Sequence, residues 1–178
     1  AISSENLAKS IKLRNLAVGK KIVTTNDNNS KKEIKVTQGK SRKEFNIKNL
    51  KSNIVTIRIG QGHGSGFFVG NNGYLVTNAH VVGDSKNVQI ITSSGMEIEG
   101  QVIRKSKSRD VSLIKVPLKI TNSLYLKFEI PDIASDVYAA GTPIDEALKT
   151  TVTKGIISNI RVDNASGLKF IQADASIS

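Results

Sequence analysis

The amino-acid sequence predicts an all-β protein, built as a sandwich or barrel of antiparallel strands. From residue 53 onward, short segments rich in β-branched and aromatic residues recur about every 8 to 14 residues, with turn sequences between them. No full-length helical pattern interrupts these segments, and no internal repeat is present. The 178 residues, 38% of them hydrophobic, suffice for one medium domain or two small ones with a packed core.

The strands can be placed along the chain by their alternating apolar residues. In order, they are NIVTIRI (53–59), SGFFVG (65–70), YLVTN (74–78), NVQIIT (87–92), MEIEGQVIRK (96–105), VSLIKV (111–116), YLKFEI (125–130), DVYAAG (136–141), TTVTKGIISNIRV (150–162) and LKFIQA (168–173). NNG at 71–73 and SSG at 93–95 indicate tight turns, because Asn and Gly tolerate positive φ. Glycines alternate at positions 60, 62, 64 and 66, which indicates an extended segment that other parts of the chain approach closely.

Residues 1–52 differ from the rest of the chain and are predicted to form a basic N-terminal extension. Residues 1–60 carry 14 Lys and Arg against 4 Asp and Glu, a net charge of +10, whereas residues 61–178 carry 12 against 11. We expect a short helix over residues 4–17 and one or two weak strands within loops over residues 20–52. The extension is either a solvated charged arm or a surface that binds an anionic partner.

Several kinds of site are excluded by what the sequence lacks. It contains no cysteine, so it has no disulfide, thiolate metal site or cysteine nucleophile. No apolar run reaches 18 residues, so no membrane-spanning helix is expected. The Gly-rich stretch at 59–68 contains neither a GxGxxG nor a GxxxxGK[ST] nucleotide motif. Ser65 is not in a GxSxG elbow, because His63 occupies the first glycine position.

A histidine and an aspartate are the best candidates for chemistry, since each stands at the end of a predicted strand. His80 follows GYLVTN at 73–78, and Asp110 precedes VSLIKV at 111–116. A histidine general base needs a carboxylate that sets its tautomer and stabilises the imidazolium, and two such ends can meet on neighbouring strands of one barrel. The spacing alone leaves open that His80 is a partly buried loop residue and Asp110 a turn residue.

Four segments resemble those of the trypsin-like serine proteases. GSGFFVGNNGYLVTNAHVV at 64–82 resembles their first barrel, most of all in the HtrA-type branch. RDVSLIKV at 109–116 resembles the segment with the family's catalytic aspartate. AAGTPIDEALKTTVTKGIISNI at 139–160 and KFIQADASIS at 169–178 resemble the second barrel and the stretch that leads into the nucleophile. The resemblance covers residues 53–178 in order.

The resemblance implies a trypsin-like double Greek-key β-barrel. A first barrel is expected over residues 53–120, and an incomplete second barrel over residues 121–178. It also implies a serine endopeptidase in which His80 is the general base and Asp110 its orienting partner, with no metal or cofactor. His63 is expected to be an exposed loop residue without a catalytic role.

The family's nucleophilic serine lies in a GNSGG segment shortly after a D-A-x-I run, which here is Asp174-Ala175-Ser176-Ile177. The serine and its oxyanion hole are therefore expected beyond Ser178. Residues 1–178 alone are expected to be inactive, since a triad without its nucleophile retains only weak catalysis.

Other functions stay open at this point. A catalytically inactive binding module with the same fold, or a fragment of a protease, would have the same strands and the same His80. A basic nucleic-acid-binding protein is a further alternative, on the charge of residues 1–52. The expected partners are a protein or peptide substrate and an anionic partner for the basic arm, and an oligomer is possible. The resemblance implies an exported bacterial protein, although a cysteine-free chain also fits the cytoplasm.

Overall fold

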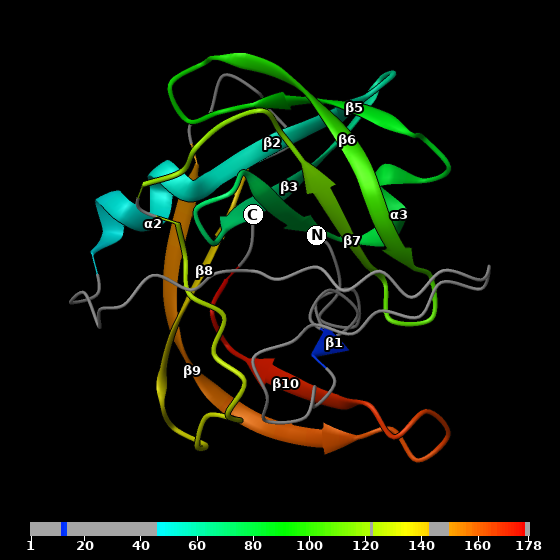
Figure 1. The fold of residues 1–178 in the computed structure, drawn as a ribbon. Helices are drawn as coiled ribbons and strands as arrows, with labels where there is room; N and C mark the ends of the chain where they lie inside the picture. The colour runs from blue at the N-terminus through cyan, green and yellow to red at the C-terminus, as the bar shows by residue number, and fades with distance from the viewer. Residues whose placement is uncertain (1–11, 14–45, 122, 143–149, 177–178) are drawn as a thin grey trace.

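The chain folds into a closed barrel and a separate sheet, as a computed structural model shows. The structure describes residues 12–13, 46–121, 123–142 and 150–176. Six antiparallel strands close the barrel in the order β2-β3-β4-β7-β6-β5, and the second sheet has the order β1-β10-β9-β8. Figure 1 shows the barrel above and the second sheet below, with the long strand β9 crossing the lower part of the view. The predicted all-β class, with a complete first barrel and a partial second unit, is confirmed.

The elements have the following bounds. The barrel consists of β2 (Ile54–Ile59), β3 (Gly62–Val69), β4 (Tyr74–Thr77), β5 (Asn87–Ile91), β6 (Glu97–Ser106) and β7 (Val111–Lys115). The second sheet consists of β1 (Lys12–Leu13), β8 (Asp136–Gly141), β9 (Thr151–Val162) and β10 (Lys169–Ala173). Two short helices are α2 (Ile47–Asn53) and α3 (Ala79–Val82).

Buried apolar side chains from five of the six strands fill the barrel, and the partly buried Ile98 and Val102 of β6 pack against them. In β5 and β7 the buried residues alternate with more exposed ones, as the period of two along a strand requires. The core cluster consists of Val55, Ile57, Phe68, Leu75, Val82, Val88, Ile90, Ile114 and Val116. Val82 belongs to α3, so the same core that closes the barrel also holds the helix that follows β4.

The predicted close approach is confirmed at two of the three glycines in β3, whereas a Cβ on Gly60, which precedes the strand, would meet nothing within 4 Å. A Cβ on Gly64 would lie 2.7 Å from Val81 of α3, and a Cβ on Gly66 would lie 2.6 Å from Leu75. At Gly62 it would meet only the Ile59 carbonyl oxygen, at an ordinary 3.5 Å. The absence of side chains at positions 64 and 66 thus lets α3 and β4 pack directly on β3.

Three of the predicted local structures are wrong where the structure describes them. Residues 125–130 form no strand: Leu126, Phe128 and Ile130 alternate as strand residues do, but Phe128 is exposed and the other two are only partly buried, so no core holds this segment to a sheet. Residues 47–53 form α2, because the Asn46 side chain accepts hydrogen bonds from the amides of Lys48 and Asn49 and caps the helix.

The helix expected over residues 4–17 lies mostly outside the described residues. Its two described residues form β1, which pairs with β10, so the prediction is wrong there. The weak strands expected over residues 20–45 also lie outside the described residues. None of the helices in the described ranges is long and apolar enough to cross a membrane.

Hydroxyl groups join the barrel to the second sheet. The Ser65 Oγ of β3 accepts a hydrogen bond from the Thr142 amide at 2.8 Å, directly after β8. Thr56 of β2 donates to the Thr142 Oγ1 at 3.1 Å. These bonds attach the end of β8 to two neighbouring barrel strands, close to the end of β4.

Candidate active site

His80 lies on a single helical turn that the barrel core holds in place. Helix α3 begins directly after β4, and its Ala79 and Val82 are buried. His80, between them, points outward, with 67% of its side chain exposed. The sequence thus buries the neighbours of His80 and leaves the imidazole at the surface.

Asp110 reaches His80 because their two strands are neighbours in the barrel. Strand β4 pairs with β7 in a register that sets Thr77 opposite Ser112. The end of β4, which leads into α3, therefore lies beside the start of β7, which follows Asp110. This juxtaposition of two strand ends is the one that the sequence indicated for His80 and Asp110.

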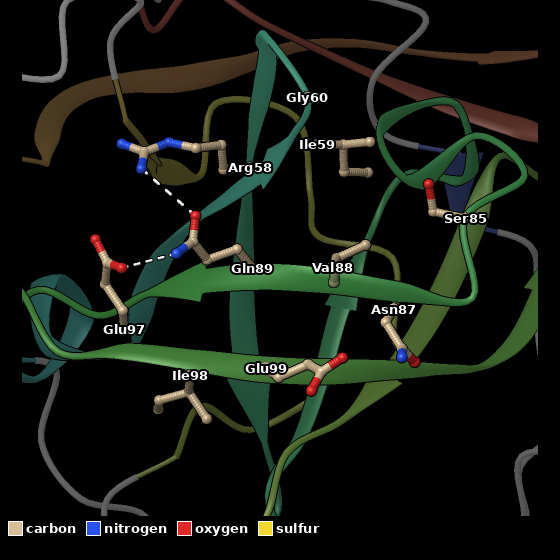
Figure 2. A pocket seen from close by; sticks show the side chains of 10 residues that line it. All are labelled: Arg58, Ile59, Gly60, Ser85, Asn87, Val88, Gln89, Glu97, Ile98 and Glu99. Carbon is tan, nitrogen blue, oxygen red and sulfur yellow. Dashed lines mark hydrogen bonds between the residues drawn. The ribbon is translucent and has the colours of Figure 1, made fainter.

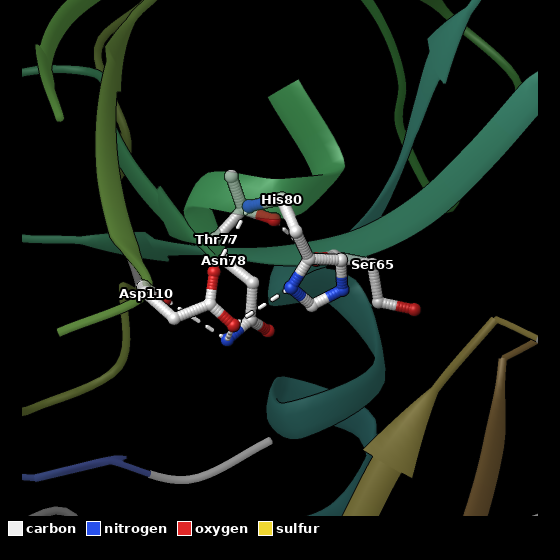
Figure 3. A network of polar contacts seen from close by, with 5 residues as sticks. All are labelled: Ser65, Thr77, Asn78, His80 and Asp110. Carbon is white, nitrogen blue, oxygen red and sulfur yellow. Dashed lines mark hydrogen bonds and ion pairs between the residues drawn. The ribbon is translucent and has the colours of Figure 1, made fainter. Parts of the chain in front are cut away.

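The carboxylate of Asp110 makes two contacts with His80 (Figure 3). Its Oδ2 lies 2.7 Å from the His80 Nδ1, and its Oδ1 accepts a hydrogen bond from the His80 amide at 2.9 Å. An ionised carboxylate only accepts hydrogen bonds, so the neutral imidazole carries its proton on Nδ1. The Nε2 atom is then the basic nitrogen, and it is the one that can take a proton from another group.

Asn78 is a third member of the site that the sequence analysis missed. Its Nδ2 donates to the Asp110 carbonyl oxygen at 3.0 Å and to the Asp110 Oδ2 at 3.1 Å. The only local signal was its position directly after a strand and two residues before the histidine, where an asparagine is also an ordinary helix cap.

The surroundings of Asp110 keep it ionised. Burial by itself would raise the pKa of the carboxyl, but the hydrogen bonds from the His80 amide and imidazole, the imidazolium charge and Asn78 outweigh it. The net effect lowers the pKa of Asp110 below its ordinary value of 3.8. Asp110 is therefore a carboxylate at neutral pH and can stabilise a positive charge on His80.

Ser65 is near this network, but it is engaged elsewhere. In the view of Figure 3 it lies on the other side of the imidazole from Asp110. Its Oγ accepts from the Thr142 amide, and its carbonyl oxygen accepts from the buried Thr77 hydroxyl at 2.8 Å. Among the residues that the structure describes, none forms a hydrogen bond with the His80 Nε2.

His63 is not part of the network, and its expected position was wrong. It lies within β3, opposite Arg58 of β2, and is partly buried rather than in an exposed loop. In the described part of the chain, no three His, Asp or Glu side chains gather as metal ligands would.

An open hollow of about 570 Å³ lies on another part of the barrel, over β2, β5 and β6. Figure 2 shows that its charged and polar side chains face one another across the strands. Gln89 accepts from Arg58 at 3.5 Å and donates to Glu97 at 2.7 Å. Neither His80 nor Asp110 lines this hollow, so it is separate from the candidate active site.

Comparisons with known proteins agree with this geometry. Residues 64–178 match the family described as "Trypsin-like peptidase domain". The chain is 36% identical over 121 residues to a "Probable periplasmic serine endoprotease DegP-like" of Rhizobium meliloti (strain 1021), covering 66% of this chain and 24% of that protein. It is 39% identical over 115 residues to a protein of the same description from Buchnera aphidicola, covering 60% of this chain and 23% of that one.

A third relative covers more of the chain. It is a "Serine protease HtrA-like" of Staphylococcus aureus (strain USA300), 30% identical over 183 residues, which covers 92% of this chain and 23% of the relative. The chain spans about a quarter of the length of the curated relatives it matches.

Proposed function

The chain belongs to the family of trypsin-like peptidase domains, and from that premise we propose that it forms part of a serine endopeptidase of the HtrA-like branch. The observation that carries the proposal is the Asp110–His80 pair, with 2.7 Å between Oδ2 and Nδ1 and the Nε2 side open. The family fold supports peptide-bond hydrolysis, and this pair is what such hydrolysis needs from a general base. The names of the relatives, which include serine endoprotease, point the same way.

In the proposed reaction, a serine hydroxyl attacks the carbonyl carbon of a peptide bond. His80 takes the hydroxyl proton on Nε2 as the new C–O bond forms, and it then passes this proton to the leaving amine as the C–N bond breaks. Water repeats the two steps to release the acyl group and regenerate the serine. Asp110 holds the Nδ1–H throughout and stabilises the imidazolium.

The nucleophile in this proposal lies outside residues 1–178. The similarity of KFIQADASIS at 169–178 to the stretch before the family's serine supports this assignment. In the structure this stretch is tied to β9, because the Asp174 Oδ1 accepts from the Ile156 amide at 2.6 Å and the Ser176 carbonyl from the Thr153 hydroxyl at 2.5 Å. The oxyanion hole is proposed to come from the same outside residues as the serine.

Three further parts of the proposal concern the chain as a whole. We divide it into a basic extension (1–52) and a protease domain (53–178), with the extension binding an anionic partner through its excess of Lys and Arg. The protein is exported, as the word periplasmic in the names of its relatives suggests. The substrate is a protein or peptide.

The test uses the full-length protein and a fluorophosphonate probe, which reacts with activated serines. We expect one adduct by intact mass, formed at least about 100-fold more slowly in His80→Ala, because the serine then lacks its base. Asp84→Asn is the matched control, since Asp84 pairs with Lys105 at 3.1 Å and is highly exposed, and it should label at the normal rate. If the full-length protein neither labels nor cleaves an unfolded protein, the proposal is wrong and a binding module of the same fold takes its place.

The anionic-partner part is tested separately by removing residues 1–52 from the full-length protein. The removal should weaken binding to a polyanion such as heparin and leave probe labelling intact. Unchanged binding would contradict this part alone.

A further inference from the structure

Asn78 stands at the N-cap of helix α3 but does not cap it. Its backbone is extended, with φ −74° and ψ 148°, as an N-cap residue requires, yet its side chain makes no capping hydrogen bond. Its Nδ2 donates two hydrogen bonds to Asp110, one to the carbonyl oxygen at 3.0 Å and one to Oδ2 at 3.1 Å (Figure 3). Both of these atoms are acceptors, so the amide nitrogen of Asn78 has to face Asp110.

Asp110 performs the capping in place of Asn78. Its Oδ1 accepts from the His80 amide at 2.9 Å, and that amide is one of those that an N-cap side chain normally satisfies. The carboxylate therefore binds the helix start with one oxygen and the imidazole with the other. Asp110 thus caps the helix, and the Asn78 side chain binds Asp110 instead of capping. These hydrogen bonds connect the β6–β7 turn to α3.

The backbone of Asp110 also needs support. Its φ is +50°, in the left-handed region, where residues other than glycine carry a conformational cost. Asn78 binds the main-chain oxygen and the carboxylate of this one residue, so it restrains the backbone and the side-chain rotation together. Without that restraint, only the amide and the imidazole of His80 hold the carboxylate, and its orientation toward the His80 Nδ1 is less firmly set.

We propose that Asn78 is a positioning residue that orients the Asp110 carboxylate and thereby keeps His80 in the Nδ1–H tautomer, with Nε2 as the base. The predicted effect of Asn78 on the rate of hydrolysis rests on the proposed peptidase function. Its predicted effect on the His80 tautomer does not. In this scheme Asn78 touches neither the substrate nor the reacting atoms, and it acts through Asp110.

The first measurement is the tautomer of His80, from imidazole ¹⁵N chemical shifts of the histidine-labelled full-length protein. The His80 signals are assigned by their loss in His80→Gln, and His63 serves as an internal reference. Neutral His80 should be the Nδ1–H tautomer in the unmodified protein and a mixture of tautomers in Asn78→Ala. Asn78→Asp keeps the shape of the side chain but cannot donate a hydrogen bond to Asp110. Its His80 should therefore be at least as mixed in tautomer as that of Asn78→Ala.

The second measurement is peptide hydrolysis. We expect kcat to fall about 10- to 100-fold in Asn78→Ala, the loss expected for hydrogen bonds to a charged group, with KM changed by less than about twofold. Asn46→Ala is the matched control: Asn46 truly caps its helix, α2, so its loss should lower thermal stability without changing tautomer or kcat.

Three results would overturn the inference. These are a His80 in the unmodified protein that is not the Nδ1–H tautomer, an Asn78→Ala protein that retains this tautomer, and one that retains its normal kcat. The first needs only the His80→Gln assignment, so it can overturn the inference even if the Asn78 variants do not fold. Failure of the peptidase proposal is recognised separately, as the absence of hydrolysis by the unmodified protein.

Discussion

Replacing Asp110 by asparagine tests the candidate site most directly, because the two side chains have the same shape. In the structure the carboxylate faces only donors: the His80 amide at Oδ1, and the His80 Nδ1 and Asn78 Nδ2 at Oδ2. An asparagine must put its own NH₂ group at one of these two places. At Oδ1 it would oppose the His80 amide, and at Oδ2 it would oppose Asn78 and turn His80 to the Nε2–H tautomer.

The size of the effect follows from these alternatives. The second arrangement removes the basic lone pair from Nε2, and in a Ser-His-Asp triad this change lowers kcat by about 10⁴-fold. Either arrangement leaves a donor of the site unsatisfied and should cost about 1–3 kcal/mol in the free energy of unfolding. Asp110→Asn is therefore expected to fold, to be less stable and to be nearly inactive.

The assay combines peptide hydrolysis by the full-length protein, the imidazole ¹⁵N shifts and urea unfolding at neutral pH. Asp84→Asn changes a carboxylate that pairs with Lys105 and Lys107 and makes no contact with His80, so it should resemble the unmodified protein in all three. A kcat of Asp110→Asn within about tenfold of normal would refute the reasoning, because a triad aspartate contributes far more than that.

Three other predictions concern the fold and its response to acid. Gly155→Ala should lower the free energy of unfolding by about 1–3 kcal/mol in urea, since a Cβ there would lie 2.5 Å from the Asp174 Oδ1. Gly62→Ala is the control, because its Cβ would make only an ordinary contact. Equal stabilities of the two variants would contradict the packing argument. Ser65→Ala should cost about 1 kcal/mol by the same measurement, because the Thr142 amide loses its acceptor; no loss would mean that this link between barrel and sheet contributes nothing. Because folding lowers the pKa of Asp110, the carboxylate stabilises the fold above the ordinary value of 3.8, and this contribution is lost as the pH falls through the lower folded value. The difference in the free energy of unfolding between the unmodified protein and Asp110→Asn should therefore shrink toward about pH 2. A difference that grows in acid would show that the pKa of Asp110 shifts in the opposite direction.

Most barrel strands were predictable because their pattern is local. In β5 the apolar Val88 and Ile90 are the buried positions, and the NNG and SSG turns lie between strands as expected. The pattern is less direct in β7, where the polar Ser112 is buried together with Ile114. Residues 125–130 show the limit of this argument. Their residues Leu126, Phe128 and Ile130 alternate in the same way, but nothing in the alternation says whether a core will cover that face, and here Phe128 stays exposed.

The candidate site was only partly predictable. His80 and Asp110 could be selected from their places at strand ends and from the family resemblance, and the structure brings them within 2.7 Å. The contribution of Asn78 could not be foreseen, because an asparagine before a helical turn predicts a cap. Only the fold brings a competing carboxylate to the helix start and leaves the Asn78 amide to hold that carboxylate.

The sequence by itself determined the all-β class, the positions of the barrel strands and turns, and the two residues most suited to proton transfer, since each depends on neighbours a few positions away. The tertiary structure decided which strand ends meet. Closing the barrel pairs β4 with β7 and sets Thr77 opposite Ser112, and a shift of one residue would turn every side chain of the strand to the other face. The contacts among His80, Asp110 and Asn78 join residues about 30 positions apart, and only this register creates them.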